Sequence, residues 1–282
     1  MTTLRALFRA GSAMALLTLS AVAAALPTVV STNLCADQAV LGLAAPEQIL
    51  SVSAKARDAG LSAFAERARD YPVNHGSAEE MLYLRPDIVV ASRSWAGSRQ
   101  GRLLAAQGIR VVTMRNPQTL AEILDNTRLL AEQLGRAETG AALVAELERR
   151  STVLREQARE LPVLYLRPNG GSAGRGTYVD EITTLLGLTN LPAAEGIAGW
   201  GQYPLELLVR RPPALFLTGF FDQPWPLHKT LYGQHPALRK LLATRPAVAV
   251  PETLWSCGNW LLVEAAERIA SELAALSAEH VR

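Results

Sequence analysis

A helix-and-strand segment occurs twice in this chain, and the repeat limits its fold more than any other feature. Residues 76–92 and 203–219 align at an offset of 127 positions, which places Glu79 opposite Glu206. Each copy has the pattern of a short amphipathic helix with an early glutamate, stopped by a proline and followed by a buried apolar strand. A unit duplicated at this spacing predicts two similar α/β lobes with a ligand cleft between them.

The register of the repeat has two readings. At the offset of 127, Ile88-Val89-Val90 matches Leu215-Phe216-Leu217, whereas a shift by one residue places Arg85-Pro86 on Arg211-Pro212. Strand and helix patterns alternate through the rest of the chain, which is typical of mainly parallel sheets covered by helices. The expected strands are residues 27–31, 48–53, 87–92, 109–114, 163–167, 215–217 and 248–250, and the expected helices are residues 36–44, 61–69, 99–107, 120–134, 137–160 and 179–186.

A long helix after Gly135 divides this α/β pattern into two halves. Leu143, Val144, Leu147 and Leu154 lie along one face of it, and charged residues occupy the other. A single unbroken helix between lobes is a stiff connector. The predicted organisation is a signal peptide at 1–25, an N-terminal lobe at 26–135, a connecting helix at 136–160 and a C-terminal lobe at 161–282, with both lobes Rossmann-like.

The first 25 residues have the pattern of a cleaved export signal. Arg5 and Arg9 form a basic start, a small and apolar run follows, and Ala23-Ala24-Ala25 matches an A-x-A cleavage site. The alternative is a membrane anchor, but the apolar run is shorter than the roughly 20 residues that a span needs. Thr32-Asn33-Leu34 before Cys35 is no lipid-attachment signal. The mature chain is therefore expected to be soluble in the periplasm.

Removing this leader changes the charge of the protein. It contains two of the 28 basic residues and none of the 26 acidic ones, so the remaining chain of about 255 residues is neutral. A neutral surface gives no electrostatic reason to expect nucleic acid or an acidic membrane as a partner.

Five segments, taken in order, resemble a known family of transport proteins: Ser31-Thr32-Asn33; Glu79 to Pro86-Asp87; Leu134-Gly135 to Gly140 and Leu143; Trp200 to Glu206 and Pro213; and Trp255 to Trp260-Leu261. The chain is similar to the class III periplasmic substrate-binding proteins of ABC importers, which carry cobalamin, haem or ferric siderophores. The resemblance implies two lobes joined by one long helix, a monomer, no cofactor, no catalysis, and a permease of the inner membrane as partner.

The resemblance also gives the repeated glutamates a role. In that family one glutamate on each lobe meets arginines of the permease, and the matching residues here are Glu79 and Glu206. The alternative is that each is a first-turn carboxylate favoured by the helix dipole.

Ligand-binding residues are expected in loops at the carboxyl ends of the strands, where such folds form their cleft. Most of the tryptophans fall there, and aromatic surfaces suit a large planar ligand, although some tryptophans are expected only to cap the lobe cores. Phe220 and Phe221 lie in one of these loops. The candidate ligand-binding residues are Asn33, His75, Arg93, Trp95, Arg167, Tyr178, Trp200, Trp225 and Trp255.

The ligand itself has several readings. A corrinoid such as cobalamin comes first, because Trp200 resembles an aromatic lining position of the cobalamin binders. Haem requires an axial ligand, and haem-binding relatives place a tyrosine just before a segment like Ser77-Ala78-Glu79; here Tyr71 is one residue out of register and His75 is nearby. A ferric siderophore is a further alternative. A zinc or manganese site is not predicted, because three or four clustered ligands are missing.

The two cysteines, Cys35 and Cys257, are an even number in an oxidising compartment and predict a disulfide between the lobes. The alternative is two free cleft thiols that contact a metal or a corrinoid.

A serine hydrolase is a remote alternative. Gly170-Gly171-Ser172-Ala173-Gly174 matches the G-x-S-x-G motif, but a nucleophile elbow requires a helix directly after the serine. Arg175-Gly176-Thr177 intervenes, so Ser172 is not expected to be catalytic. The glycines and Arg175 instead predict a loop that contacts an anionic group.

Overall fold

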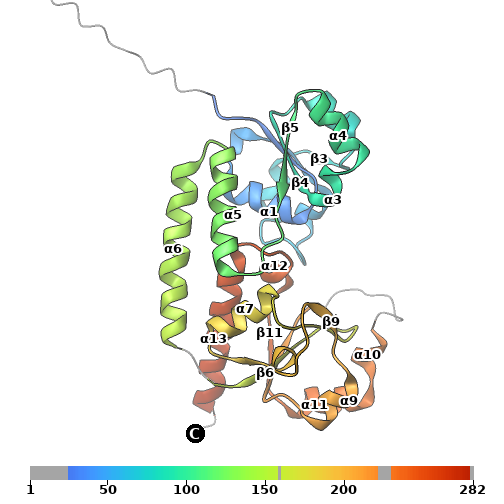
Figure 1. Ribbon diagram of the computed structural model, residues 1–282, viewed down its shortest axis with the longest axis vertical. Coiled ribbons are helices and arrows are strands. Elements are labelled where there is room, and N and C mark those ends of the chain that lie inside the picture. Colours follow the sequence, from blue (N-terminus) through green and yellow to red (C-terminus); the bar gives the residue numbers. More distant parts are fainter. Residues whose placement is uncertain (1–24, 158–159, 222–229, 280–282) are drawn as a thin grey trace, which may run out of the picture.

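The structure, a computed structural model, describes residues 25–157, 160–221 and 230–279 (Figure 1). Two α/β lobes lie one above the other in this view, and long helices run along one side of both. The predicted leader falls almost entirely outside the described residues, and Trp225 falls outside them as well. Within the described part of the chain, no helix is both long and apolar enough to cross a membrane.

Each lobe is built on a parallel sheet, as the alternating pattern predicts. The strands are β1 (Val29–Ser31), β2 (Ile49–Ser53), β3 (Val73–Asn74), β4 (Ile88–Ser92), β5 (Arg110–Met114), β6 (Pro162–Leu166), β7 (Gly171–Ala173), β8 (Thr189–Asn190), β9 (Trp200–Gln202), β10 (Leu215–Thr218) and β11 (Ala247–Ala249). The N-lobe sheet has the order β3-β2-β1-β4-β5 and the C-lobe sheet the order β11-β10-β6-β8, with parallel pairing throughout. β7 and β9 form a separate antiparallel pair.

The helices begin largely where side chains cap them. Ser77 with Glu80, and Thr119 with Glu122, form capping boxes that satisfy the first backbone N–H groups of two helices. The α-helices are α1 (Leu34–Leu43), α2 (Ala78–Leu84), α3 (Arg93–Ala96), α4 (Arg99–Ala106), α5 (Leu120–Gln133), α6 (Ala137–Glu156), α7 (Tyr178–Leu185), α8 (Leu191–Ala194), α9 (Leu205–Arg210), α10 (Leu231–Gln234), α11 (Pro236–Thr244), α12 (Glu252–Trp255) and α13 (Leu261–Glu279); three 3-10 helices are η1 (Pro46–Gln48), η2 (Ala54–Arg57) and η3 (Arg67–Asp70).

The structure decides the register of the repeat in favour of the offset of 127. Ile88 of β4 and Leu215 of β10 face the same central core, whereas the next residues, Val89 and Phe216, face an outer core beneath their own repeat helix. A slip by one residue would turn every strand side chain to the opposite face. The alignment shifted by one is therefore wrong, and the two copies occupy equivalent places in the two sheets.

A helical hairpin connects the lobes. Gly135 follows the C-cap of α5, and its φ of 69° allows the N–H of Arg136 to donate to the carbonyl oxygen of Ala131. Gly140 then lets α6 pack closely, because a Cβ there would lie 2.3 Å from the Cβ of Ala131. α6 runs unbroken for 20 residues beside both lobes, so the prediction of two lobes joined by one long helix is confirmed (Figure 1).

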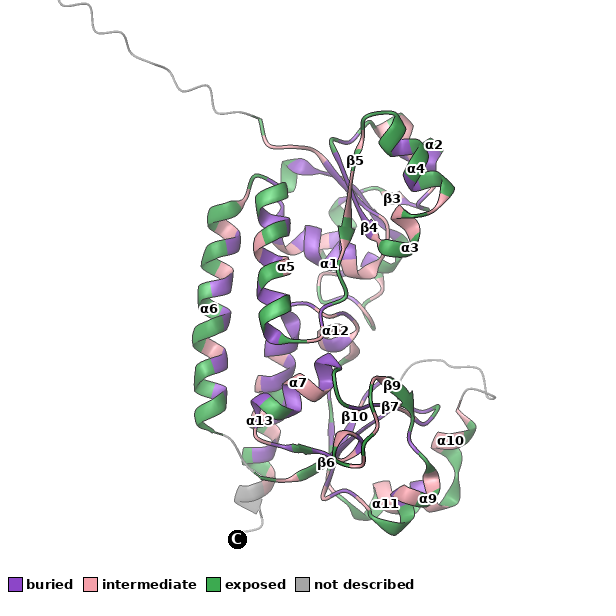
Figure 2. Cartoon of the chain, in the orientation of Figure 1, coloured by how far each residue is buried: buried purple, intermediate pink, exposed green. Residues whose placement is uncertain are grey.

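The largest hydrophobic core belongs to both lobes at once. It includes Val29 from the N-lobe sheet, Leu217 from the C-lobe sheet, and Leu262 and Ile269 from α13. α6 turns a buried stripe toward the interior and an exposed face outward (Figure 2). Two smaller cores lie on the outer faces of the sheets. The lobes therefore share an interior in addition to their connector.

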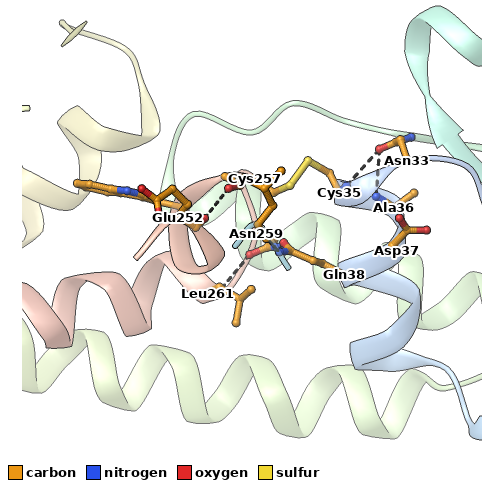
Figure 3. Close-up of a disulfide and its surroundings, with 12 residues drawn as sticks. Asn33, Cys35, Ala36, Asp37, Gln38, Glu252, Cys257, Asn259 and Leu261 are labelled. Carbon is orange, nitrogen blue, oxygen red and sulfur yellow. Dashed lines mark hydrogen bonds between the residues drawn. A yellow bond between two sulfur atoms is a disulfide. The ribbon is translucent and has the colours of Figure 1, made fainter. Parts of the chain in front are cut away.

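A covalent bridge and two hydrogen bonds also tie α1 to the segment around α12 (Figure 3). Cys35 and Cys257 form a disulfide with their Cα atoms 5.5 Å apart, so the bridge predicted from the even cysteine count is present and the alternative of free thiols is wrong. The Nε2 group of Gln38 donates to the carbonyl oxygen of Thr253 at 3.4 Å, and its Oε1 accepts from Asn259.

One expected helix, residues 61–69, does not form. The N–H of Gly60 donates to Oδ1 of Asp58, and the N–H of Phe64 donates to Oγ of Ser62. These short side chains satisfy backbone groups locally and compete with helix formation. The segment is a series of turns that leads into η3.

Candidate ligand-binding site at the facing edges of the lobes

In open parallel sheets, ligands bind beyond the carboxyl ends of the strands. In the N-lobe this edge carries the residues after β1, β3 and β4, and in the C-lobe it carries the residues after β6 and β10. Figure 1 shows α1 and α3 on the side of the N-lobe turned toward the C-lobe, and β9 on the side of the C-lobe turned toward the N-lobe. We call these two surfaces the facing edges.

Arg167 is the centre of an aromatic cluster on the C-lobe facing edge. It follows β6, is half-buried, and donates from Nε to the phenol oxygen of Tyr165 at 2.6 Å. Its guanidinium carbon lies 4.4 Å from the ring centre of Phe220, 5.1 Å from that of Trp200 and 5.5 Å from that of Tyr165. Among the described residues, no carboxylate forms an ion pair with it. A half-buried cation without an acidic partner attracts an anionic group.

Trp200, Tyr178 and Trp255 join this cluster in different ways. Trp200 is 43% exposed, and its ring centre lies 6.2 Å from that of Tyr165 and 5.0 Å from that of Tyr178. Tyr178 is buried and donates its hydroxyl to the carbonyl oxygen of Trp255 at 3.0 Å; burial raises the pKa of Tyr178 and keeps its phenol neutral. Trp255 is buried 4.7 Å from Tyr165. Among these three residues, Trp200 is therefore the exposed ring, and Tyr178 and Trp255 are buried.

His75 lies on the N-lobe facing edge with one of its ring nitrogens held. Its side chain is 81% exposed, and Nδ1 lies 3.0 Å from Oε1 of Glu80. Oε2 of Glu80 accepts the backbone N–H groups of His75 and Ser77. The bond from the His75 side chain, helped by these backbone bonds, lowers the pKa of Glu80 to about 2, so this carboxylate is charged at neutral pH. Metal-binding histidines are commonly oriented in this way, with the other nitrogen free for the metal.

The remaining N-lobe candidates have structural partners. Trp95 donates from Nε1 to the carbonyl oxygen of Gly76 at 3.0 Å, which places it beside the loop of His75. The side-chain oxygen of Asn33 caps α1 by accepting two backbone N–H groups. Arg93 begins α3 and is exposed. Across the described ranges, no three His, Cys, Asp or Glu side chains are grouped so that they could hold a metal ion.

The structure therefore groups the candidates by lobe. Arg167, Trp200 and Trp255 each contact Tyr165, and Tyr178 contacts Trp200 and Trp255. On the N-lobe, Trp95 bonds to Gly76, the residue after His75. Sequence reasoning missed Tyr165, because a tyrosine inside a strand has the pattern of an ordinary core residue. Its position two residues before Arg167, on the same side of the strand, was the available signal.

A second residue that sequence reasoning missed is Asp37, a fully buried carboxylate of α1 beneath the N-lobe facing edge. It accepts hydrogen bonds from Oγ of Ser31 at 2.5 Å and from both the N–H and Oγ of Ser53, at 2.9 and 2.5 Å. Burial raises its pKa to about 6, although these bonds act in the opposite direction. The three bonds hold together the ends of β1 and β2.

Ser172 does not have the geometry of a nucleophile. It lies inside β7 rather than on a strand-to-helix turn, is buried, and donates its hydroxyl to the carbonyl oxygen of Tyr165 at 2.6 Å. The expected anion-binding loop is also different, because Gly171–Ala173 is a strand and Arg175 donates to the carbonyl oxygen of Ala193.

Two grooves are lined by none of the candidate ligand-binding residues. One, of about 240 Å³, is lined by β5 and α5, and the other, of about 330 Å³, by α6 and α13. Neither has an aromatic side chain in its lining. The aromatic rings suited to a large planar ligand are at the facing edges instead.

Two parallel-sheet lobes joined by a long helix, with binding groups at their facing edges, define a two-lobed binding protein. A family model described as "Periplasmic binding protein" matches residues 29–219, and the chain belongs to this family. The resemblance to class III periplasmic binding proteins of ABC importers is confirmed. Members of the family are substrate-binding transport proteins of the periplasm.

Solved structures share this fold at low sequence identity. The periplasmic haem-binding protein RhuT from Roseiflexus sp. RS-1 is 22% identical, with a TM-score of 0.68, over 87% of this chain and 98% of that one. The periplasmic haem-binding protein HutB of Vibrio cholerae is 21% identical, with a TM-score of 0.70, over 88% of this chain and 98% of that one. The periplasmic vitamin B12-binding protein BtuF of Vibrio cholerae is 18% identical, with a TM-score of 0.65, over 89% of this chain and 97% of that one. No curated protein sequence matches the chain.

Proposed function

We propose that this protein binds a tetrapyrrole metal chelate between its lobes and delivers it to the permease of an ABC importer. The observation that carries the proposal is Arg167, a half-buried cation among aromatic rings, next to the exposed ring of Trp200. A flat chelate stacks on Trp200, and an acidic side group of the same ligand meets the guanidinium.

Haem fits these features best. It carries two propionate groups, which suit Arg167, and an iron with axial positions that histidine can fill. His75, with Nδ1 directed to Glu80, has its other ring nitrogen available for this bond. The similar folds of RhuT and HutB, both described as haem-binding, agree with this choice.

A corrinoid is the second candidate, and the tryptophans of the sequence favour it. The phenol oxygens of Tyr165 and Tyr178 are already engaged inside the protein. A chelate whose metal brings its own axial groups needs neither of them, and BtuF, a vitamin B12-binding protein, has a similar fold.

The permease is proposed to meet both lobes through Glu79 and Glu206. Each is the second residue of its repeat helix, α2 or α9, and each is exposed. Because the repeat places these carboxylates equivalently, one on each lobe, they suit a partner with two matching cationic contacts.

The ligand is tested by titration. The protein is purified from the periplasm, its absorbance spectrum is recorded, and the ligand-free form is titrated with haemin, cyanocobalamin and a ferric hydroxamate siderophore. We expect haemin to bind with a Soret shift, and Arg167→Ala to weaken it about tenfold or more. Arg239→Ala, an exposed arginine of α11, is the matched control. Binding of cyanocobalamin alone favours the second candidate, and binding of none of the three contradicts the proposal.

A further inference from the structure

Phe220 has a backbone conformation that phenylalanine rarely adopts. Its φ is 65°, in the left-handed region, which is an outlier for a bulky side chain. It comes two residues after the end of β10, on the C-lobe facing edge. Strained residues of this kind persist only where their surroundings fix them, and they concentrate at ligand-binding sites.

Glu252, the first residue of α12, is what fixes this turn. Its Oε1 accepts the backbone N–H of Phe220, a charge-assisted hydrogen bond. The N–H of Gly219 donates to the carbonyl oxygen of Leu166 at 3.2 Å, so the turn is also tied to the end of β6. The conformation of Phe220 thus depends on a carboxylate that lies 32 positions further along the chain.

The ring of Phe220 is directed at Arg167. Its centre is 4.4 Å from the guanidinium carbon, the shortest of the three ring distances at this cation. The phenol oxygen of Tyr165 accepts the Nε–H of Arg167. Because Nε is engaged in this way and the Phe220 ring lies against the guanidinium, a ligand has to use the terminal N–H groups of Arg167.

Glu252 also acts on Tyr165, the phenol that accepts the Nε–H of Arg167. Burial raises the pKa of Tyr165, and the charge of Glu252 adds a smaller effect in the same direction. The carboxylate itself accepts the N–H of Phe220, and this bond fixes the turn that carries the ring.

We infer that Glu252 and Phe220 are positioning residues that make Arg167 selective for a planar carboxylate on the ligand. A shielded guanidinium accepts an anion in its own plane, along the terminal N–H edge, and this is the geometry of bidentate carboxylate binding. The inference rests on the proposed function and names the acidic group that the ligand presents to Arg167.

Ligand pairs that differ only in the acid test this inference. Haemin is compared with haemin dimethyl ester, and a monocarboxylic acid of cyanocobalamin with cyanocobalamin itself. For the pair that binds, we expect the wild type to prefer the acid at least about tenfold. In Phe220→Ala and Glu252→Ala, we expect the ratio of the Kd of the ester or amide form to the Kd of the acid form to fall toward one. The Kd of the ester or amide form itself should stay within about twofold of the wild-type value.

Two matched variants separate positioning from general stability. Glu252→Gln keeps an oxygen for the N–H of Phe220 and is expected to keep the preference. Phe221→Ala, at the neighbouring and partly exposed phenylalanine, is expected to keep it as well. Thermal unfolding establishes that each variant is folded before its Kd is measured.

The contrary outcomes are distinct. If Glu252→Ala weakens both members of a pair equally, its role is only structural and the inference is overturned. If the wild type binds acid and ester equally, the inference fails while the proposed function stands. If no chelate of either pair binds, the proposed function fails and the inference fails with it.

Discussion

The side-chain amide of Asn259 donates a hydrogen bond of 2.7 Å to the amide oxygen of Gln38, although 221 positions separate the two in the chain. Gln38 belongs to α1 of the N-lobe, and Asn259 lies between α12 and α13, next to the disulfide (Figure 3). Both side chains are buried, so removing either partner leaves a polar group without its bond. The boundary between the lobes is therefore held by a polar contact as well as by the covalent one.

Removal of the disulfide is expected to destabilise the protein strongly. Cys35 and Cys257 are 222 positions apart, and in the chain-entropy model a closed loop of this length contributes about 5 kcal/mol. We expect the double variant Cys35→Ser, Cys257→Ser to lose much of this free energy of unfolding, measured in urea. Reduction of the wild type should reproduce the loss. An unchanged urea midpoint in both experiments would contradict the prediction.

Asp37 is expected to make stability depend on pH. Its native pKa of about 6 lies above its ordinary value of 3.8, so the native state binds this proton more tightly than the unfolded chain does. Its contribution to the free energy of unfolding is full below about pH 4 and is lost as the pH rises through about 6, a change of about 3 kcal/mol. Between pH 4 and pH 7, the free energy of unfolding of the neutral variant Asp37→Asn should therefore rise relative to that of the wild type by up to this amount. If the two free energies change with pH in parallel, the prediction is wrong.

Close packing between the lobes makes Gly42 intolerant of a side chain. A Cβ at this position of α1 would lie 2.3 Å from Cζ2 of Trp260, which is buried. We expect Gly42→Ala to lower the free energy of unfolding by about 1–3 kcal/mol. Gly201→Ala is the control, because a Cβ there meets nothing within 4 Å. Equal destabilisation by the two substitutions would refute the packing argument.

Permease docking is expected to depend on the two repeat glutamates. The double variant Glu79→Lys, Glu206→Lys reverses two exposed charges while leaving the Arg167 cluster intact, so we expect normal ligand affinity and a loss of uptake in cells. The control is the double variant Glu132→Lys, Glu156→Lys. It makes the same change of net charge at two exposed glutamates of α5 and α6, away from the repeat helices. Normal uptake by the first variant, or equal loss in both, would argue against docking through Glu79 and Glu206.

The lobes were predictable because their signals are local. A proline after each repeat helix and the apolar strand behind it are visible in any short window of the sequence. Residues 61–69 failed because Asp58 and Ser62 satisfy backbone groups through side-chain bonds, which periodicity does not register. The same limit explains why the shifted alignment of the repeat stayed open until the faces of β4 and β10 were known.

The candidate site was predictable in part. Arg167 and His75 were candidates because they follow strands, where ligand loops begin, whereas Trp200 turned out to begin the short strand β9. Their roles in ligand binding stay predictions. Tyr165 and Asp37 were missed because they act from inside regular elements, and Glu252 was missed because its partner Phe220 is distant in the chain. The preference for a corrinoid stays a prediction, and the surroundings of Arg167 shift our proposal toward a ligand that bears carboxylates.

The placement of the inter-lobe contacts along the chain has a consequence for how the molecule matures. Cys35, Gln38 and Gly42 all lie in α1, near the start, whereas Cys257, Asn259 and Trp260 lie near the end. A chain is synthesised from its N-terminus, so α1 has to wait, partly uncovered, for almost the whole sequence to follow. A polypeptide that stopped short of residue 257 would keep a reactive thiol at Cys35 and an unfilled surface on α1. The packing around α1 in the first lobe is therefore completed only when the C-terminal segment has been synthesised and has folded against it.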